Sequence, residues 1–217
     1  MIIKIAKYLF FRLLSAYDAR AGNDGMTLID LGQINVSNAR VLHNRDALVS
    51  KMTTNGNVAE IGVNKGKFSK TILKLNKPRR LHLIDCWGSI RYSSSEEKFV
   101  RKEFNDEITA GTIIINKGLS TEVLTHFEDA YFDWVYIDSD HGYQVTMAEL
   151  ILLDSKIREN GIIAGHDYTS RSRLRARRYG VIEAVHEFCS AKGYEFIFIT
   201  LETHGHNSFA IRKISKD

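Results

Sequence analysis

Cysteine and proline are the residues that this chain has least of. Its 217 residues include two cysteines and one proline. Cys86 and Cys189 are far apart and belong to no metal-ligand spacing, so we expect neither a disulfide framework nor a structural zinc site. Such sparse cysteine is typical of a reducing compartment, and we expect a cytoplasmic protein. One proline with 15 glycines also argues against extended disorder.

The chain also lacks an apolar run long enough to cross a bilayer, which takes about 20 residues. Its most apolar stretch, residues 1–14, is interrupted by Lys4, Lys7 and Arg12. We expect an amphipathic helix there that caps the domain, pairs with a second copy of the chain or lies on a membrane surface. A cleaved signal peptide is the alternative, because small residues at 19–21 follow the stretch, but Arg12 breaks its apolar core.

Charge of neither sign dominates. Lys and Arg number 30 and Asp and Glu 26, an excess of four that fits an acidic substrate or a membrane surface without requiring either. Hydrophobic residues make up 44% and charged residues 26%, as in soluble globular proteins. A chain of this length suits one α/β domain with an addition rather than two domains.

Apolar runs alternate with helical patterns from residue 58 onward, which is typical of βαβ crossovers and a parallel sheet. Strands are expected at residues 58–61, 81–84, 112–115, 134–137, 162–164, 196–199 and 208–212. The last two are joined by a connection too short for a crossover, so they should pair antiparallel. Helices are expected at residues 45–52, 96–104, 122–127, 145–158 and 181–192.

These elements predict a Rossmann-like, doubly wound α/β domain over residues 53–217. Its sheet would be mainly parallel and seven-stranded, with a C-terminal antiparallel hairpin. Residues 22–57 contain no clear strand. Residues 1–52 are therefore expected to form a helical extension or lid.

The most informative motif covers residues 58–66, where an apolar strand opens into a turn that contains Gly62 and Gly66. Glycine lets the backbone turn sharply and approach a ligand closely. A helix should follow, with Ser69 in its first turn, where free N–H groups can bind an anion. The next apolar run ends in Asp85, which can accept hydrogen bonds from both hydroxyls of a ribose. This layout predicts a nucleoside site; an ordinary strand–turn–helix with a surface Asp is the alternative.

Polar residues follow the fourth and fifth of the predicted strands. Asp138 comes directly after the fourth, and His166 and Asp167 come after the fifth. Because the carboxyl ends of neighbouring parallel strands share one edge, we expect these side chains to converge. Two carboxylates and an imidazole suit Mg²⁺, Mn²⁺ or a borderline ion such as Fe²⁺ or Zn²⁺. The alternative to a metal site is that these acids are structural and only cap helices or form hydrogen bonds with loops.

Three further features belong to the same edge. His141 could take a proton from a substrate hydroxyl near neutral pH. The turn at residues 204–207 contains two histidines, which could supply a ligand or a base, although a structural hairpin turn explains it better. Five arginines in residues 171–178 would match an anionic substrate, or form a solvated loop. No aromatic residues interleave with them, so nucleic-acid binding is not expected.

Residues 58–212 resemble the class I S-adenosylmethionine-dependent methyltransferases. The resemblance is carried by Glu60-Ile61-Gly62 with Gly66, followed by Asp85 and Asp138 in that order. The strand order and the terminal antiparallel hairpin agree with that superfamily. Within it, residues 118–120, 132–141 and 161–168 look most like small-molecule O-methyltransferases of the catechol type and the related bacterial sugar-modifying group.

The resemblance implies roles for particular residues. The implied cofactor-binding residues are Glu60, Gly62, Gly66 and Ser69 at the methionine part, Asp85 at the ribose, Gly118, Leu119 and Ser120 at the adenine, and Asp138. Asp138, His166 and Asp167 fall where the family places its metal ligands, but His166 replaces the usual acid or amide, which leaves metal identity and dependence open. His141 takes the place of a lysine base and would act in catalysis with Asp138.

The sequence therefore predicts an S-adenosylmethionine-dependent enzyme that methylates a hydroxyl of a sugar, a polyketide or a phenol. The reaction is expected either with or without the help of Mg²⁺ or another divalent ion. An NAD-dependent oxidoreductase fits less well, because the spacing Gly-x-Gly-x-x-Gly is absent. A catalytically idle cofactor-binding protein, anchored by its N-terminal helix, is a third reading. Intact Asp138, His141 and Asp167 argue against it.

Overall fold

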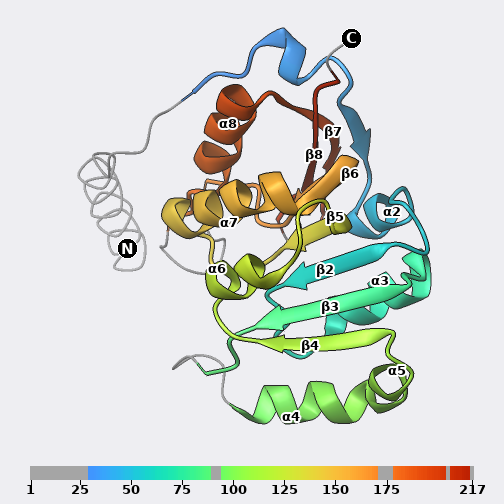
Figure 1. Cartoon of the computed structure of the whole chain (residues 1–217). Coiled ribbons are helices and arrows are strands. Elements are labelled where there is room, and N and C mark those ends of the chain that lie inside the picture. Colours follow the sequence, from blue (N-terminus) through green and yellow to red (C-terminus); the bar gives the residue numbers. More distant parts are fainter. Residues whose placement is uncertain (1–28, 89–93, 171–177, 204–205, 216–217) are drawn as a thin grey trace, which may run out of the picture.

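The computed structural model describes residues 29–88, 94–170, 178–203 and 206–215 (Figure 1). In these residues the chain forms one eight-stranded sheet with the order β1-β7-β8-β6-β5-β2-β3-β4. Three features of the sequence lie outside the described residues: the expected N-terminal helix at 1–14, the arginines at 171–177 and His204.

The sheet confirms the predicted doubly wound architecture. Its strands are β1 (Arg40–Leu42), β2 (Asn57–Ile61), β3 (Arg80–Asp85), β4 (Ile113–Lys117), β5 (Phe132–Ile137), β6 (Ile157–Gly165), β7 (Tyr194–Thr200) and β8 (Phe209–Lys213). β8 runs antiparallel to its neighbours β6 and β7, and the other neighbouring pairs are parallel. The C-terminal antiparallel hairpin was therefore predicted correctly.

The expected number of strands was wrong by one. Residues 22–57, in which no strand was predicted, contain β1, which pairs in parallel with β7 at the edge of the sheet. β1 has only three residues, and Val41 at its centre is exposed. A strand of this kind is held by its backbone pairing with β7, so its side chains carry no alternating apolar pattern that a sequence could reveal.

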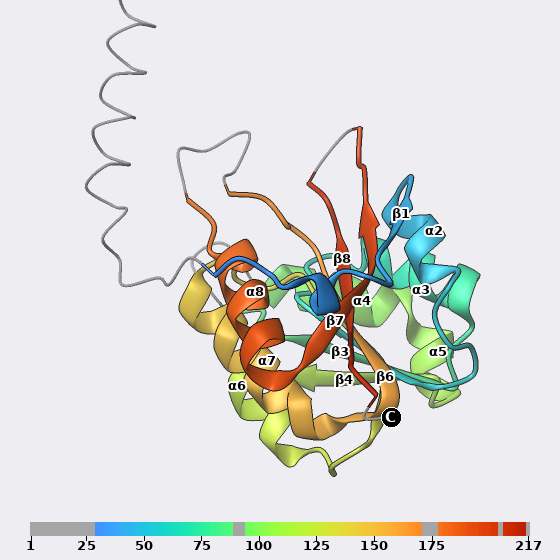
Figure 2. The ribbon, with the colours of Figure 1, turned by 90° about the horizontal axis from the view of Figure 1, so that it is seen from above.

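Helices cover both faces of the sheet, as Figure 2 shows from above. On one side lie α2 (Arg45–Val49), α3 (Lys67–Asn76), α4 (Ser94–Glu103) and α5 (Asn105–Thr109). On the other lie α6 (Ser120–Val123), the 3₁₀ turn η2 (Leu124–His126), α7 (Tyr143–Lys156) and α8 (Val181–Lys192), and a 3₁₀ turn η1 (Gln33–Asn35) precedes the sheet. None of the helices in the described part of the chain is long and apolar enough to cross a membrane.

Two hydrophobic cores fill the spaces between these layers. One core joins the sheet to α7 and α8 through Leu150, Val185 and Phe188. The other joins the opposite face to α2 and α3 through Leu48 and Ile72. Since the central strands are covered on both faces, all five residues of β2 are buried, and its sequence shows no alternation of apolar and polar residues.

Backbone hydrogen bonds continue past the carboxyl ends of the strands and hold the following loops side by side. Gly62 N donates to Ile84 O over 2.9 Å, and Asp138 N donates to Ile61 O over 2.7 Å. In the same way, Gly118 N donates to Asp85 O, and His166 N donates to Ile137 O. The arrowheads of β2, β3 and β4 in Figure 1 mark this edge. The loops that were expected to hold the functional residues therefore begin next to one another.

Gly62 lets two of these loops approach each other closely. It has a φ of +91°, and a Cβ atom there would lie 2.1 Å from Asp138 O. Gly111 has a similar φ of +74°, but a Cβ there would meet nothing within 4 Å. A residue with a side chain would be strained by the positive φ at either position. Only at Gly62 would it also collide with neighbouring atoms.

Gly62→Ala should therefore destabilise the protein more than Gly111→Ala. Strain alone costs about 1–2 kcal/mol, and the collision at Gly62 raises the total to about 2–5 kcal/mol. Urea denaturation of both variants measures the free energies of unfolding. Equal losses in the two variants would contradict the close approach at Gly62.

Candidate active site

A cavity of about 400 Å³ lies at the carboxyl edge of the sheet. Its walls come from the loops after β2, β3, β4 and β5 and from the start of α7. Six of the predicted cofactor-binding residues line it: Gly62, Asp85, Gly118, Leu119, Ser120 and Asp138. His141 lines it as well. A cavity of this size is typical of a small-molecule or cofactor site.

The other three predicted cofactor residues do not line this cavity. Glu60 is buried in β2, where its Oε2 accepts a 2.5 Å hydrogen bond from the hydroxyl of Ser69. Burial raises the pKa of Glu60 to about 8, against the opposing effect of this hydrogen bond. Gly66 caps α3 with a φ of +70° and packs against the ring of Phe104. Glu60 and Ser69 therefore join β2 to α3, and Gly66 joins the glycine turn to α3.

The carboxylate of Asp85 organises the same turn. Its Oδ2 accepts hydrogen bonds from the backbone N–H groups of Val63 (2.8 Å) and Asn64 (2.9 Å), and its Oδ1 accepts one from Trp87 (2.9 Å). A carboxylate has about four acceptor positions, so one on Oδ1 remains for a ligand. Ribose binding by Asp85 stays a prediction, and the structure adds a second role in shaping the loop.

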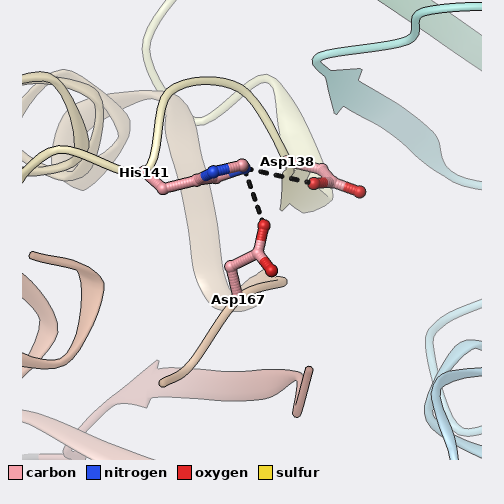
Figure 3. A group of neighbouring side chains, drawn as sticks. All are labelled: Asp138, His141 and Asp167. Carbon is pink, nitrogen blue, oxygen red and sulfur yellow. Dashed lines mark ion pairs between the residues drawn. The ribbon is translucent and has the colours of Figure 1, made fainter. Parts of the chain in front are cut away.

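Asp138, His141 and Asp167 form a charged group at the rim of the cavity (Figure 3). His141 Nε2 lies 2.7 Å from Asp167 Oδ2 and 3.9 Å from Asp138 Oδ1. Burial favours the neutral imidazole, but the two carboxylates outweigh it and raise the pKa of His141 to about 9. In this state the imidazole is protonated at neutral pH and holds the carboxylates together.

Asp167 is surrounded by imidazoles. Besides His141, His166 lies with its Nδ1 3.4 Å from Asp167 Oδ1, and His206 Nδ1 contacts the same oxygen. Burial opposes ionisation of Asp167, but His141 and His166 outweigh it and hold its pKa below the usual range. The turn between β7 and β8 thus does reach the site, through His206.

The donor atoms of Asp138, His141 and Asp167 all lie within 4.8 Å of one another, which fits a divalent ion between them. An ion bound at about 2.1 Å from each ligand needs donor atoms roughly 3–4 Å apart, so the three side chains would shift slightly to bind it. The sequence predicted His166 rather than His141 as the nitrogen ligand. His166 Nδ1 lies 3.7 Å from Asp138 Oδ1 and so faces the same two carboxylates.

Two residues at the site were not expected from the sequence. Arg45, on α2, places its guanidinium 3.8 Å from Asp138 Oδ2 and 4.5 Å from the ring centre of Phe68. Glu149, on α7, is completely buried and accepts hydrogen bonds from Ser120 and Ser139. Long-range packing brings both to the site, and neither belongs to a local motif that could have revealed it.

The model of a methyltransferase-domain family matches residues 59–168, slightly more than half of the chain. The chain therefore belongs to this family and is an S-adenosylmethionine-dependent methyltransferase. The cavity between the glycine turn, Asp85 and Gly118 is accordingly its candidate cofactor site. No curated protein sequence matches the chain.

Solved structures share the fold at low sequence identity. A putative rRNA-methylase from Clostridium thermocellum is 14% identical, with a TM-score of 0.60 over 81% of this chain and 99% of the other. The O-methyltransferase TomG from Streptomyces achromogenes, which is involved in tomaymycin synthesis, is 17% identical, with a TM-score of 0.56 over 79% and 78%. A methyltransferase from Aquifex aeolicus is 11% identical, with a TM-score of 0.56 over 77% and 87%.

Glu60→Gln should change how stability depends on pH. The pKa of Glu60 is 4.5 for an ordinary side chain and about 8 in the fold, so between these values the folded protein keeps a proton that the unfolded chain has lost. The free energy of unfolding therefore falls as the pH rises through this range. A Gln amide can accept the same hydrogen bond from Ser69, but it does not titrate.

Urea denaturation of the cofactor-free protein at pH 5, 6.5 and 8 tests this. The wild type should lose stability relative to Glu60→Gln with each step. The exposed Glu128 provides the matched control, since Glu128→Gln should follow the wild type throughout. A constant difference between the wild type and Glu60→Gln at all three pH values would contradict the burial argument.

Proposed function

We propose that this methyltransferase transfers its methyl group to a hydroxyl oxygen of a small-molecule acceptor, such as a sugar, a polyketide or a phenol. One observation carries the proposal: Asp138 and His141 line the cofactor cavity and also form, with Asp167, a charged group at its rim. An acceptor hydroxyl beside this group lies next to the cofactor and to residues that can orient it and take its proton.

The reaction mainly requires that the acceptor hydroxyl is aligned with the cofactor and loses its proton. The methyl group on the sulfonium is already activated, so the enzyme must place a deprotonated oxygen in line with it, and positioning supplies much of the rate. His141 in its neutral form is the proposed proton acceptor, because it lines the cavity and its ring lies 2.7 Å from Asp167. The charge of the two carboxylates, which keeps His141 protonated without a bound ion, must therefore be offset before it can act. His166 does not line the cofactor cavity, so we do not assign it as the proton acceptor.

Asp138, Asp167 and an imidazole would hold a divalent ion such as Mg²⁺ or Mn²⁺. Both His141 and His166 place a nitrogen within 3.9 Å of an oxygen of each carboxylate, so one can be a ligand while the other moves a proton. We assign His166 as the ligand. A bound ion would lower the pKa of a coordinated hydroxyl and offset the carboxylate charge that keeps His141 protonated.

A second cavity of about 420 Å³ adjoins the cofactor cavity and is the proposed acceptor cleft. The two cavities share Asp140 and Val145. Tyr143 and Tyr179 contribute aromatic surface to the cleft, and the ring of Tyr179 lies 4.5 Å from that of His141. Aromatic faces beside polar groups suit a ring-shaped acceptor with hydroxyls, such as a sugar or a phenol.

A panel of sugars, polyketides and phenols tests the proposal, with S-adenosylhomocysteine release as the readout and mass spectrometry and NMR to locate the new methyl group. We expect an O-methylated product from at least one acceptor class, with Mg²⁺ or Mn²⁺ present. Methylation at nitrogen or carbon would contradict the assignment. Cofactor binding without any product from the panel would contradict the proposed acceptor classes.

His141→Ala should lower kcat on such an acceptor by about 10²–10⁴-fold, the usual effect of removing a general base. Binding of S-adenosylhomocysteine should change little, because the lost imidazole acts on the acceptor. The exposed His126 gives a matched control, since His126→Ala should keep full activity. Undiminished turnover by His141→Ala would exclude His141 as the proton acceptor.

Asp167→Asn should abolish tight binding of Mn²⁺, measured by electron paramagnetic resonance and by metal content after dialysis. Asn tolerates the positive φ of 55° at this position, so the loss would reflect the charge rather than the fold. The wild type should bind one ion per chain. A wild type that binds no ion, or Asp167→Asn that binds as the wild type does, would contradict the metal site.

A further inference from the structure

Glu149 lies directly behind the wall of the cofactor cavity. It is on α7, one helical turn after Val145, which lines the cavity. Its side chain is completely buried and does not itself line the cavity. Burial raises the pKa of Glu149 to about 7, so the carboxylate is ionised in mildly alkaline solution.

Two serines connect Glu149 to the cavity. Ser120, after β4, donates its hydroxyl proton to Glu149 Oε1 over 2.5 Å. Ser139, after β5, donates to Oε1 and Oε2 over 2.7 and 2.9 Å. Both serines line the cavity. The carboxylate thereby ties together the two loops that form this end of the site.

This arrangement decides what the serines can offer a ligand. An ionised carboxylate only accepts hydrogen bonds, and a serine hydroxyl has one proton and two acceptor positions. Because both protons point at Glu149, each hydroxyl can only accept a hydrogen bond from a ligand. Leu119, next to Ser120, and Val145, one helical turn before Glu149, also line the cavity and have no side-chain donor to compensate. This end of the cavity therefore favours a ligand that donates.

We propose that Glu149 is a positioning residue that makes the cofactor site select a purine with an amino group at C6 over one with an oxo group. The proposal requires the base of the cofactor to occupy the end of the cavity at Ser120 and Ser139. An amino group there offers two donor hydrogens to the serines. An oxo group is itself an acceptor, so its lone pairs would face the lone pairs of the serine oxygens without a proton between them. Leaving such groups unpaired lowers affinity by roughly 10- to 100-fold.

The test compares S-adenosylhomocysteine with S-inosylhomocysteine, its deaminated analogue, by calorimetry at pH 8.5. The wild type should bind the adenosyl compound at least about tenfold more tightly. In Glu149→Gln, the amide nitrogen can donate to Ser139, whose own proton can then turn to the ligand. The inosyl analogue should therefore gain affinity, which a loss of structural support alone would not produce.

Two further variants complete the experiment. The exposed Glu122, on α6, gives the matched control, since Glu122→Gln should keep both affinities. Ser139→Ala leaves the carboxylate in place and should weaken binding of the adenosyl compound more than that of the inosyl compound. Equal binding of the two ligands by the wild type, or an unchanged affinity ratio in Glu149→Gln and Ser139→Ala, would overturn the proposal. Because no acceptor is used, the result is independent of O-methylation.

Discussion

The close approach of Gly62 to Asp138 is the constraint on which the site depends. A side chain at Gly62 would collide with the backbone oxygen of Asp138, and the hydrogen bond from Asp138 N to Ile61 O holds the two loops at this distance. The turn after β2 and the loop after β5 therefore form one rigid edge. The cofactor cavity and the Asp138–His141–Asp167 group lie on this edge and take their geometry from it.

Charge at the site is balanced among a few groups, of which Asp167 is buried and the others are partly exposed. Asp138 and Asp167 are surrounded by His141, His166, His206 and Arg45, which come from four different loops or helices. Leaving a buried carboxylate unpaired is costly, so these partners hold the loops together in the cofactor-free protein. An acceptor hydroxyl or a divalent ion would enter a place where strong ion pairs already exist, and would replace some of them.

Much of the fold followed from the sequence, because its central strands are short buried runs bounded by turns. β2, β3 and β5 were located within one or two residues, and α8 was located as it stands. The edge strand β1 was missed, because its pairing with β7 depends on backbone groups that no residue pattern records. The expected helix at 122–127 divides into α6 and a 3₁₀ turn, a local difference that periodicity does not resolve.

The candidate site was predictable where it depends on strand ends. Asp138, His166 and Asp167 could be placed together, with His141 on the same edge, because parallel strands bring their carboxyl ends to one edge. Arg45 and Glu149 could not, because each reaches the site from a helix whose packing is set by the whole core. A buried glutamate and an exposed one look the same in a helix sequence.

The proposed chemistry depends on one spatial relation: the cofactor would lie across the carboxyl edge of β2, β3, β4 and β5, with its sulfur beside the Asp138–His141–Asp167 group. A crystal structure of the complex with S-adenosylhomocysteine measures this directly. We expect the base near Gly118 and Ser120, the ribose near Asp85, and the sulfur near Asp138 and His141. A complex in which the sulfur points away from Asp138 and His141, or in which the ligand occupies another part of the molecule, would contradict this arrangement.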